Sequence, residues 1–90
     1  CYALLANWML ARTDGNMRKL RYAVEQMQSR NDSPNGYRAQ ASAALFLALS
    51  SNAQTQEAGE QKAQAIALLL KNMDSAAAEA LWMHWIASGK

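Results

Sequence analysis

The run from Gly36 to Ser50, GYRAQASAALFLALS, is the feature that most limits what this chain can fold into. On an α-helix its small residues would occupy more than one side: Ala41, Ala44 and Ala48 on one, and Ala39, Ala43 and Leu47 on another. Other helices can approach a helix closely wherever its surface is small and apolar. We therefore expect a central helix here, with the remaining helices packed against it.

The aliphatic composition favours helices over strands. Ala and Leu dominate, and the β-branched aliphatic residues are only Val24, Ile66 and Ile86. The 90 residues predict one small all-α domain, residues 1–90, near the lower end of what a single core can hold together. Binding to a partner, or self-association, would add stability to such a domain.

Periodicity and capping residues predict about five short antiparallel helices. The first covers Tyr2 to Arg12, the second covers about Asn16 to Ser29, and the third starts either at Ser33-Pro34 or at Tyr37. Thr55 is expected to cap the fourth helix, and Asp74 or Ser75 the fifth, which ends at Ser88-Gly89. Thr13 or Asp14 is expected to cap the second helix, and Arg21 to pair with Glu25 on its surface.

The spacing of apolar residues predicts which side of each later helix is buried. On the second helix the stripe is Met17, Leu20, Val24 and Met27. On the fourth we expect Ala63, Ile66, Leu69, Leu70 and Met73 to point inward, and on the fifth Ala77, Leu81, Trp82, Trp85 and Ile86. Tyr22 lies off the stripe of its helix and is expected to be partly exposed.

Residues 37 to 88 resemble a stack of helical hairpins of the tetratricopeptide (TPR) class. The resemblance rests on helix length and on alanine placement, with Ala63 and Ala67 as the small packing positions of the fourth helix. The Trp-Leu-Gly-Tyr pattern of that family and its closing proline are missing. A plain helical bundle fits the same sequence equally well.

No constellation of residues indicates catalysis, a metal or a cofactor. His84 is the only histidine, and Glu79 lies five residues before it on a different face. No Gly-rich loop precedes a helix, no Ser stands in a nucleophile elbow, and the Asp residues lie in turns or caps. We therefore expect a non-enzymatic protein without a cofactor.

Aromatic residues give the best candidates for a contact with another protein. Core packing of Trp8, Phe46, Trp82 and Trp85 is the default expectation. The last helix, however, carries Trp82, Met83 and Trp85 on more than one face, and an exposed Trp and Met patch typically marks a protein contact. Trp8 and Leu5 on the first helix form a second candidate group.

The first half of the chain is basic. Between residues 12 and 38 there are six arginines and lysines against three acidic residues. Such a surface is either an ordinary solvated face or a rim of Arg18, Arg21 and Arg38 that steers an acidic partner. The alternative is a small helical DNA-binding regulator, which residues 13–21 match loosely as a turn followed by a basic helix.

Cys1 allows two interpretations of the N-terminus. As the only cysteine it cannot form a disulfide within the chain. In bacterial lipoproteins the signal peptide is removed just before a cysteine that becomes lipidated. Cys1 is therefore a lipidation candidate, and the chain would then be an accessory envelope lipoprotein or adaptor. That protein would assist a secretion complex or regulate an envelope sensor or enzyme. A fragment of a longer, cytoplasmic protein is the other interpretation. No stretch is long and apolar enough to span a bilayer.

Overall fold

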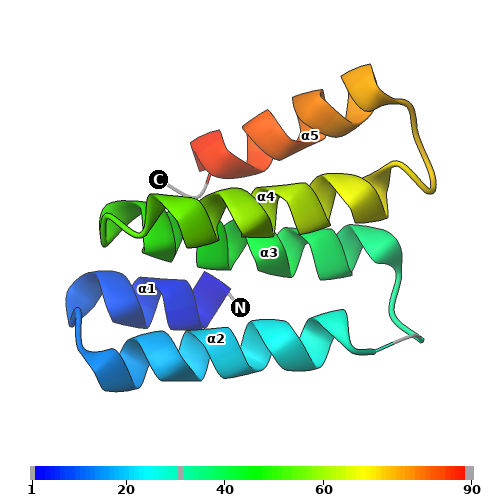
Figure 1. Ribbon diagram of the computed structural model, residues 1–90. Coiled ribbons are helices and arrows are strands. Elements are labelled where there is room, and N and C mark those ends of the chain that lie inside the picture. The colour runs from blue at the N-terminus through cyan, green and yellow to red at the C-terminus, as the bar shows by residue number, and fades with distance from the viewer. Residues whose placement is uncertain (1, 31, 89–90) are drawn as a thin grey trace.

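The computed structural model describes residues 2–30 and 32–88, which form five α-helices and no strand (Figure 1). The helices are α1 (Tyr2–Leu10), α2 (Asp14–Gln28), α3 (Asn35–Ser51), α4 (Thr55–Leu69) and α5 (Ser75–Ser88). The expected all-α bundle is therefore confirmed.

Helix α3 lies at the centre of the bundle, as the sequence predicts. It contacts each of the other four helices, and its longest contact is with α4, which runs antiparallel beside it (Figure 1). Helices α1 and α2 lie on one side of this pair and α5 lies on the other. Nine residues of α3 are buried: Ala39, Ala41, Ser42, Ala43, Ala44, Leu45, Leu47, Ala48 and Leu49.

The different sides of α3 belong to two hydrophobic clusters. The first core joins α1, α2, α3 and the start of α4, with Leu5, Trp8, Leu20 and Val24 packed on Ala41, Ala44, Leu45 and Ala48. The second core joins α3, α4 and α5 and consists of Ala39, Ala43, Ala65, Leu69, Ala78 and Trp82. Phe46 and Ile86 pack against both cores. The Phe46 and Trp82 rings meet edge to face, with centroids 5.0 Å apart.

Polar side chains fix several helix ends. The Thr13 hydroxyl accepts a hydrogen bond from the Asn16 backbone N–H and caps α2, and the Asp74 carboxylate accepts one from the Ala77 N–H at the start of α5. Both caps were predicted. Helix α2 begins two residues earlier than expected because Asp14 already follows the cap. Pro34 and Gln54 hold the cap positions of α3 and α4, so Ser33 and Thr55 do not cap them.

Most of the predicted inward residues of α4 and α5 are confirmed, and the differences lie mainly at alanines. The confirmed residues are buried in the second core or pack against it: Ile66, Leu69, Met73, Leu81, Trp82, Trp85 and Ile86. Ala63, Leu70 and Ala77 are exposed, and the buried line of α4 is Ala58, Ala65 and Leu69. Ala67 is also exposed, so neither alanine behind the TPR resemblance is a packing position. On α4 it is Ala65 that packs with Ala39 and Ala43 of α3, where small side chains let the two helices approach closely.

Enlarging a buried alanine of α3 tests this packing. Ala44→Leu should lower the free energy of unfolding by about 1–3 kcal/mol, because no space is left for the added carbons beside a side chain with no exposed surface. The matched control Ala63→Leu, at an exposed position of α4, should change it by no more than about 0.5 kcal/mol. Chemical denaturation of both variants measures the difference. Equal effects would mean that the alanines of α3 are not the points of close contact.

Candidate functional site

Three of the residues expected to contact a partner lie in the core. Trp82 and Trp8 are each 2% exposed and Leu5 is 3% exposed. Trp82 fills the second core beneath Phe46, while Trp8 and Leu5 fill the first. Their bulk complements the alanines of α3, so the expectation of a surface contact through these three residues is corrected to a packing role.

The rest of that candidate group marks a different surface, on α5. Met83 is 62% exposed and Trp85 is half-buried. Along the same side of the helix as Met83, at intervals of four, three and four residues, lie further exposed apolar side chains. We call the four residues the outer face of α5: Ala76, Ala80, Met83 and Ala87.

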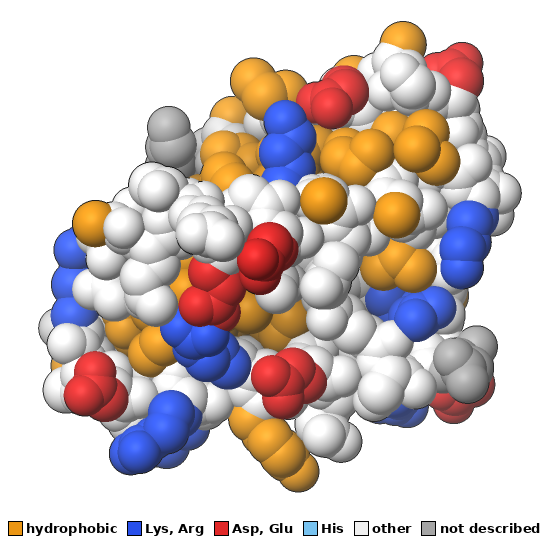
Figure 2. Space-filling view, in the orientation of Figure 1, with side chains coloured by type: hydrophobic (Ala, Val, Ile, Leu, Met, Phe, Trp, Pro, Cys, Tyr) orange, Lys and Arg blue, Asp and Glu red, His pale blue; other side chains and the backbone are white. Residues whose placement is uncertain are grey.

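Much of the solvent side of helix α5 is apolar, although Glu79, His84 and the two terminal serines are also exposed. Glu79 is its only charged residue, and Glu79 forms an ion pair with Lys62 of α4 at 3.5 Å. In the space-filling view, hydrophobic side chains gather over the part of the surface formed by α4 and α5 (Figure 2). A helix at the edge of a soluble domain normally carries polar residues outward, so this face has the composition of a surface that another chain covers.

Sequence reasoning missed Ala76, Ala80 and Ala87. An amphipathic pattern separates buried from exposed positions only where the two sides differ in polarity, and on α5 they do not. The available signal was the scarcity of charge, since Glu79 is the one charged residue of α5 and a helix at the edge of a domain usually carries polar residues outward.

The three arginines predicted as a basic rim do not act together. Arg38 is half-buried and donates from Nε to the Gln28 carbonyl oxygen at 3.0 Å, with a second bond from Nη2 to the same oxygen. It therefore holds the C-terminal end of α2 against α3. Arg21 forms an ion pair with Glu57 of α4 and not with Glu25, so it too links helices. Only Arg18 is an exposed and unpaired member of the rim among the residues described.

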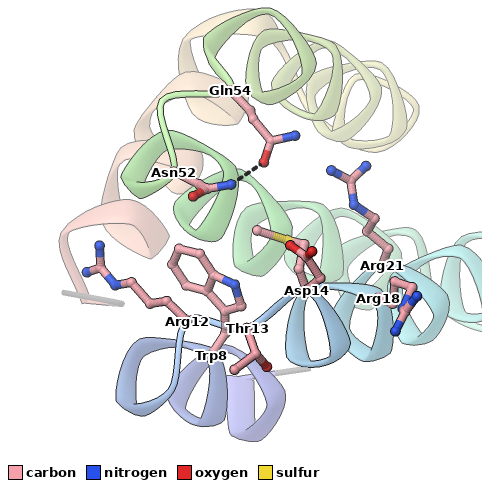
Figure 3. Close-up of a pocket in the computed structure, with 9 residues that line it drawn as sticks. Trp8, Arg12, Thr13, Asp14, Arg18, Arg21, Asn52 and Gln54 are labelled. Carbon is pink, nitrogen blue, oxygen red and sulfur yellow. Dashed lines mark hydrogen bonds between the residues drawn. The ribbon is translucent and has the colours of Figure 1, made fainter.

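Arg18 and Arg21 instead line a pocket at one end of the bundle, where the link between α1 and α2 faces the loop between α3 and α4 (Figure 3). The pocket has a volume of about 410 Å³. We call it the arginine pocket, and its lining residues are Trp8, Arg12, Thr13, Asp14, Met17, Arg18, Arg21, Asn52 and Gln54. Arg12, in the link that follows α1, lies over the ring of Trp8, with its guanidinium carbon 5.0 Å from the ring centroid.

No metal-binding cluster is present in the part of the chain that the structure describes. No three His, Cys, Asp or Glu side chains there are close enough to share a metal ion. His84 is exposed. Cys1, the lipidation candidate, lies outside the described residues, and none of the described helices has the length and hydrophobicity to cross a membrane.

Comparison with known proteins adds no assignment: no family model, no curated protein and no solved structure matches this chain significantly. The functional inference therefore rests on the two surfaces above.

The role of Arg38 gives a stability prediction. Arg38→Gln should lower the free energy of unfolding by about 1–3 kcal/mol, because the carbonyl end of α2 loses a charged double donor in a half-buried position. Arg30→Gln is the control, since Arg30 is exposed and its 3.7 Å pair with Asp32 should contribute less than about 1 kcal/mol. Urea denaturation measures both changes. Equal losses in the free energy of unfolding would contradict the role of Arg38 in holding α2 against α3.

Proposed function

We propose that this protein is a non-enzymatic interaction domain that receives an amphipathic helix of another protein on the outer face of α5. The observation that carries the proposal is the apolar solvent side of that helix, with Met83 largely exposed at its middle and alanines on either side. All four residues of the outer face are exposed in the part of the chain that the structure describes.

The shape of the face favours a helix as the occupant. Alanines at 76, 80 and 87 let a second backbone approach closely, in the way that α3 is itself approached within the bundle. Met83 is long and flexible, and such side chains adapt to irregular partner surfaces. The partner helix should therefore carry its own stripe of apolar residues, at intervals of three and four.

The basic half of the chain supports an acidic character for that partner away from the contact itself. Arg12, Arg18 and Lys19 are exposed cations without an ion pair among the described residues, and such charges raise association rates with acidic proteins. A lipid on Cys1 would make the domain an accessory lipoprotein of a bacterial envelope, with its partner among envelope proteins. The intact mass of the protein from its native host tests that placement.

Site-specific crosslinking tests the proposed face. A photo-crosslinking amino acid at position 83 should capture one protein in the native host, whereas the same group at Tyr22, an equally exposed residue of α2, should not. The crosslinked segment, made as a peptide, should bind the purified domain. Ala80→Glu should weaken that binding by about tenfold or more, because a charge would be buried in an apolar contact, and should change stability by no more than about 0.5 kcal/mol.

Two results would contradict the proposal. One is binding of the crosslinked peptide that Ala80→Glu leaves unchanged while Tyr22→Glu abolishes it. The other is a nucleic acid as the captured partner, with an affinity that falls steeply as salt rises, which would support the helical DNA-binding regulator instead. The affinity of a contact through the outer face of α5 should depend only weakly on salt, because the cations that speed association lie outside the contact.

A further inference from the structure

The outer face of α5 has the residue spacing of a coiled-coil seam. Its members, Ala76, Ala80, Met83 and Ala87, follow one another at intervals of four, three and four residues, which are the d, a, d and a positions of a heptad repeat. All four are exposed. A seam with this spacing fits one partner helix that runs nearly along α5, at a crossing angle of about 20°.

The opposite positions of the same repeat face the bundle. Ala78 is an f residue and Trp82 is a c residue, and both are buried in the second core. Trp85, the next f residue, packs against that core. Helix α5 therefore turns its c and f side to its own chain and its a and d side to solvent, at the edge of the bundle (Figure 1).

Glu79 and His84 stand on the two flanks of this seam. Glu79 occupies the g position before Ala80, and His84 occupies the e position after Met83. Both are exposed. The Glu79 side chain remains 51% exposed although the Lys62 ammonium of α4 lies 3.5 Å from its Oε2 atom, so the carboxylate is open to a second donor.

These flanks complement a second copy of α5 in a parallel arrangement. In a parallel pair of helices a g residue lies beside the e residue five places further along the partner, which sets Glu79 beside His84 of the second copy. Imidazole has an N–H to donate to a carboxylate whether it is neutral or protonated, and two-fold symmetry repeats the contact on the other flank. In an antiparallel pair Glu79 would instead face the same carboxylate of its copy, so the parallel orientation is favoured.

We propose that the outer face of α5 pairs with the same face of a second copy of this chain, as a parallel and two-fold symmetric pair of helices. Met83 meets its copy in the middle of the contact, and the alanines on either side let the two backbones approach closely. This pairing rests on the proposed function, because both need the outer face to bind a helix. It adds regulation: the partner helix binds only after the two copies separate.

The contact is small, so the dimer should be weak. Four seam residues on each copy are far fewer than the about 20–30 residues a side of a stable interface, and three of the four are alanines. We expect a dissociation constant of about 0.1–1 mM. Such a dimer leaves most faces uncovered at lower concentrations, and it lowers the apparent affinity for the partner helix only by the fraction that is covered.

Sedimentation equilibrium tests the pairing. With the purified protein at about 0.02–2 mM, a range around that dissociation constant, the average mass should rise from 9.9 kDa toward twice this value. Ala80→Glu should weaken dimerisation about tenfold or more, because it buries a charge in the seam. The matched control Ala6→Glu, at an exposed position of α1, should leave the dissociation constant within about twofold.

Two substitutions of His84 test the orientation. His84→Lys should tighten dimerisation about threefold, since each Glu79 then faces a full positive charge, and His84→Glu should weaken it by about the same factor. In an antiparallel pair position 84 would face itself, and both substitutions would weaken the dimer. That result would overturn the parallel pair.

Competition separates this inference from the proposed function. The crosslinked partner peptide, added in excess, should convert the dimer into a one-to-one complex. A chain that stays monomeric at about 2 mM, or a dimer that Ala80→Glu and Ala6→Glu affect equally, would overturn the self-pairing even where the peptide still binds the outer face. A dimer that only Ala80→Glu disrupts, in a protein for which crosslinking captures no other partner, would support the self-pairing and contradict the proposed function.

Discussion

Close approach to α3 is the constraint on which the rest of this structure depends. Its alanines lie on several sides, so α1 and α2 can pack on one side while α4 and α5 pack on another. Ser42, the one polar residue buried there, has its hydroxyl satisfied by the Gln28 side chain, which in turn donates to Gln61 of α4 at 3.2 Å. The central helix thus makes polar as well as apolar connections to its neighbours.

This arrangement leaves two different surfaces at the edges of the bundle. Helix α5 uses Ala78 and Trp82 to close the second core and leaves an apolar side outside. At the other edge, Trp8 is buried in the first core and supports Arg12 above it. The first surface is suited to a partner helix, which needs a close apolar contact, whereas the second gathers charged and polar side chains. They share no residue, and each can be disabled alone.

The central helix, the all-α class and the caps at Thr13 and Asp74 could be predicted because each depends on residues near one another in sequence. The choice between nearby alanines, Ala65 over Ala63 on α4 and Ala78 over Ala77 on α5, could not be predicted, since helices rich in alanine have no sharp boundary between an apolar and a polar side. Arg21 makes the same point for charges. The predicted partner was four residues away, at Glu25, but the structure pairs Arg21 with Glu57, thirty-six residues along the chain. The prediction that Trp8 and Trp82 contact another protein is wrong for a related reason. Large aromatic side chains complement small ones, and α3 supplies the small ones.

Amide hydrogen exchange at single-residue resolution tests the central role of α3 most directly. Because α3 is shared by both cores, its amides from Ala43 to Leu47 should exchange only through global unfolding, with the highest protection in the chain. Helices α1 and α5, which lie at the edges of the bundle (Figure 1), should open at lower free energy. Protection of α5 equal to or above that of α3, or separate unfolding of α3 with one half of the bundle, would contradict this account.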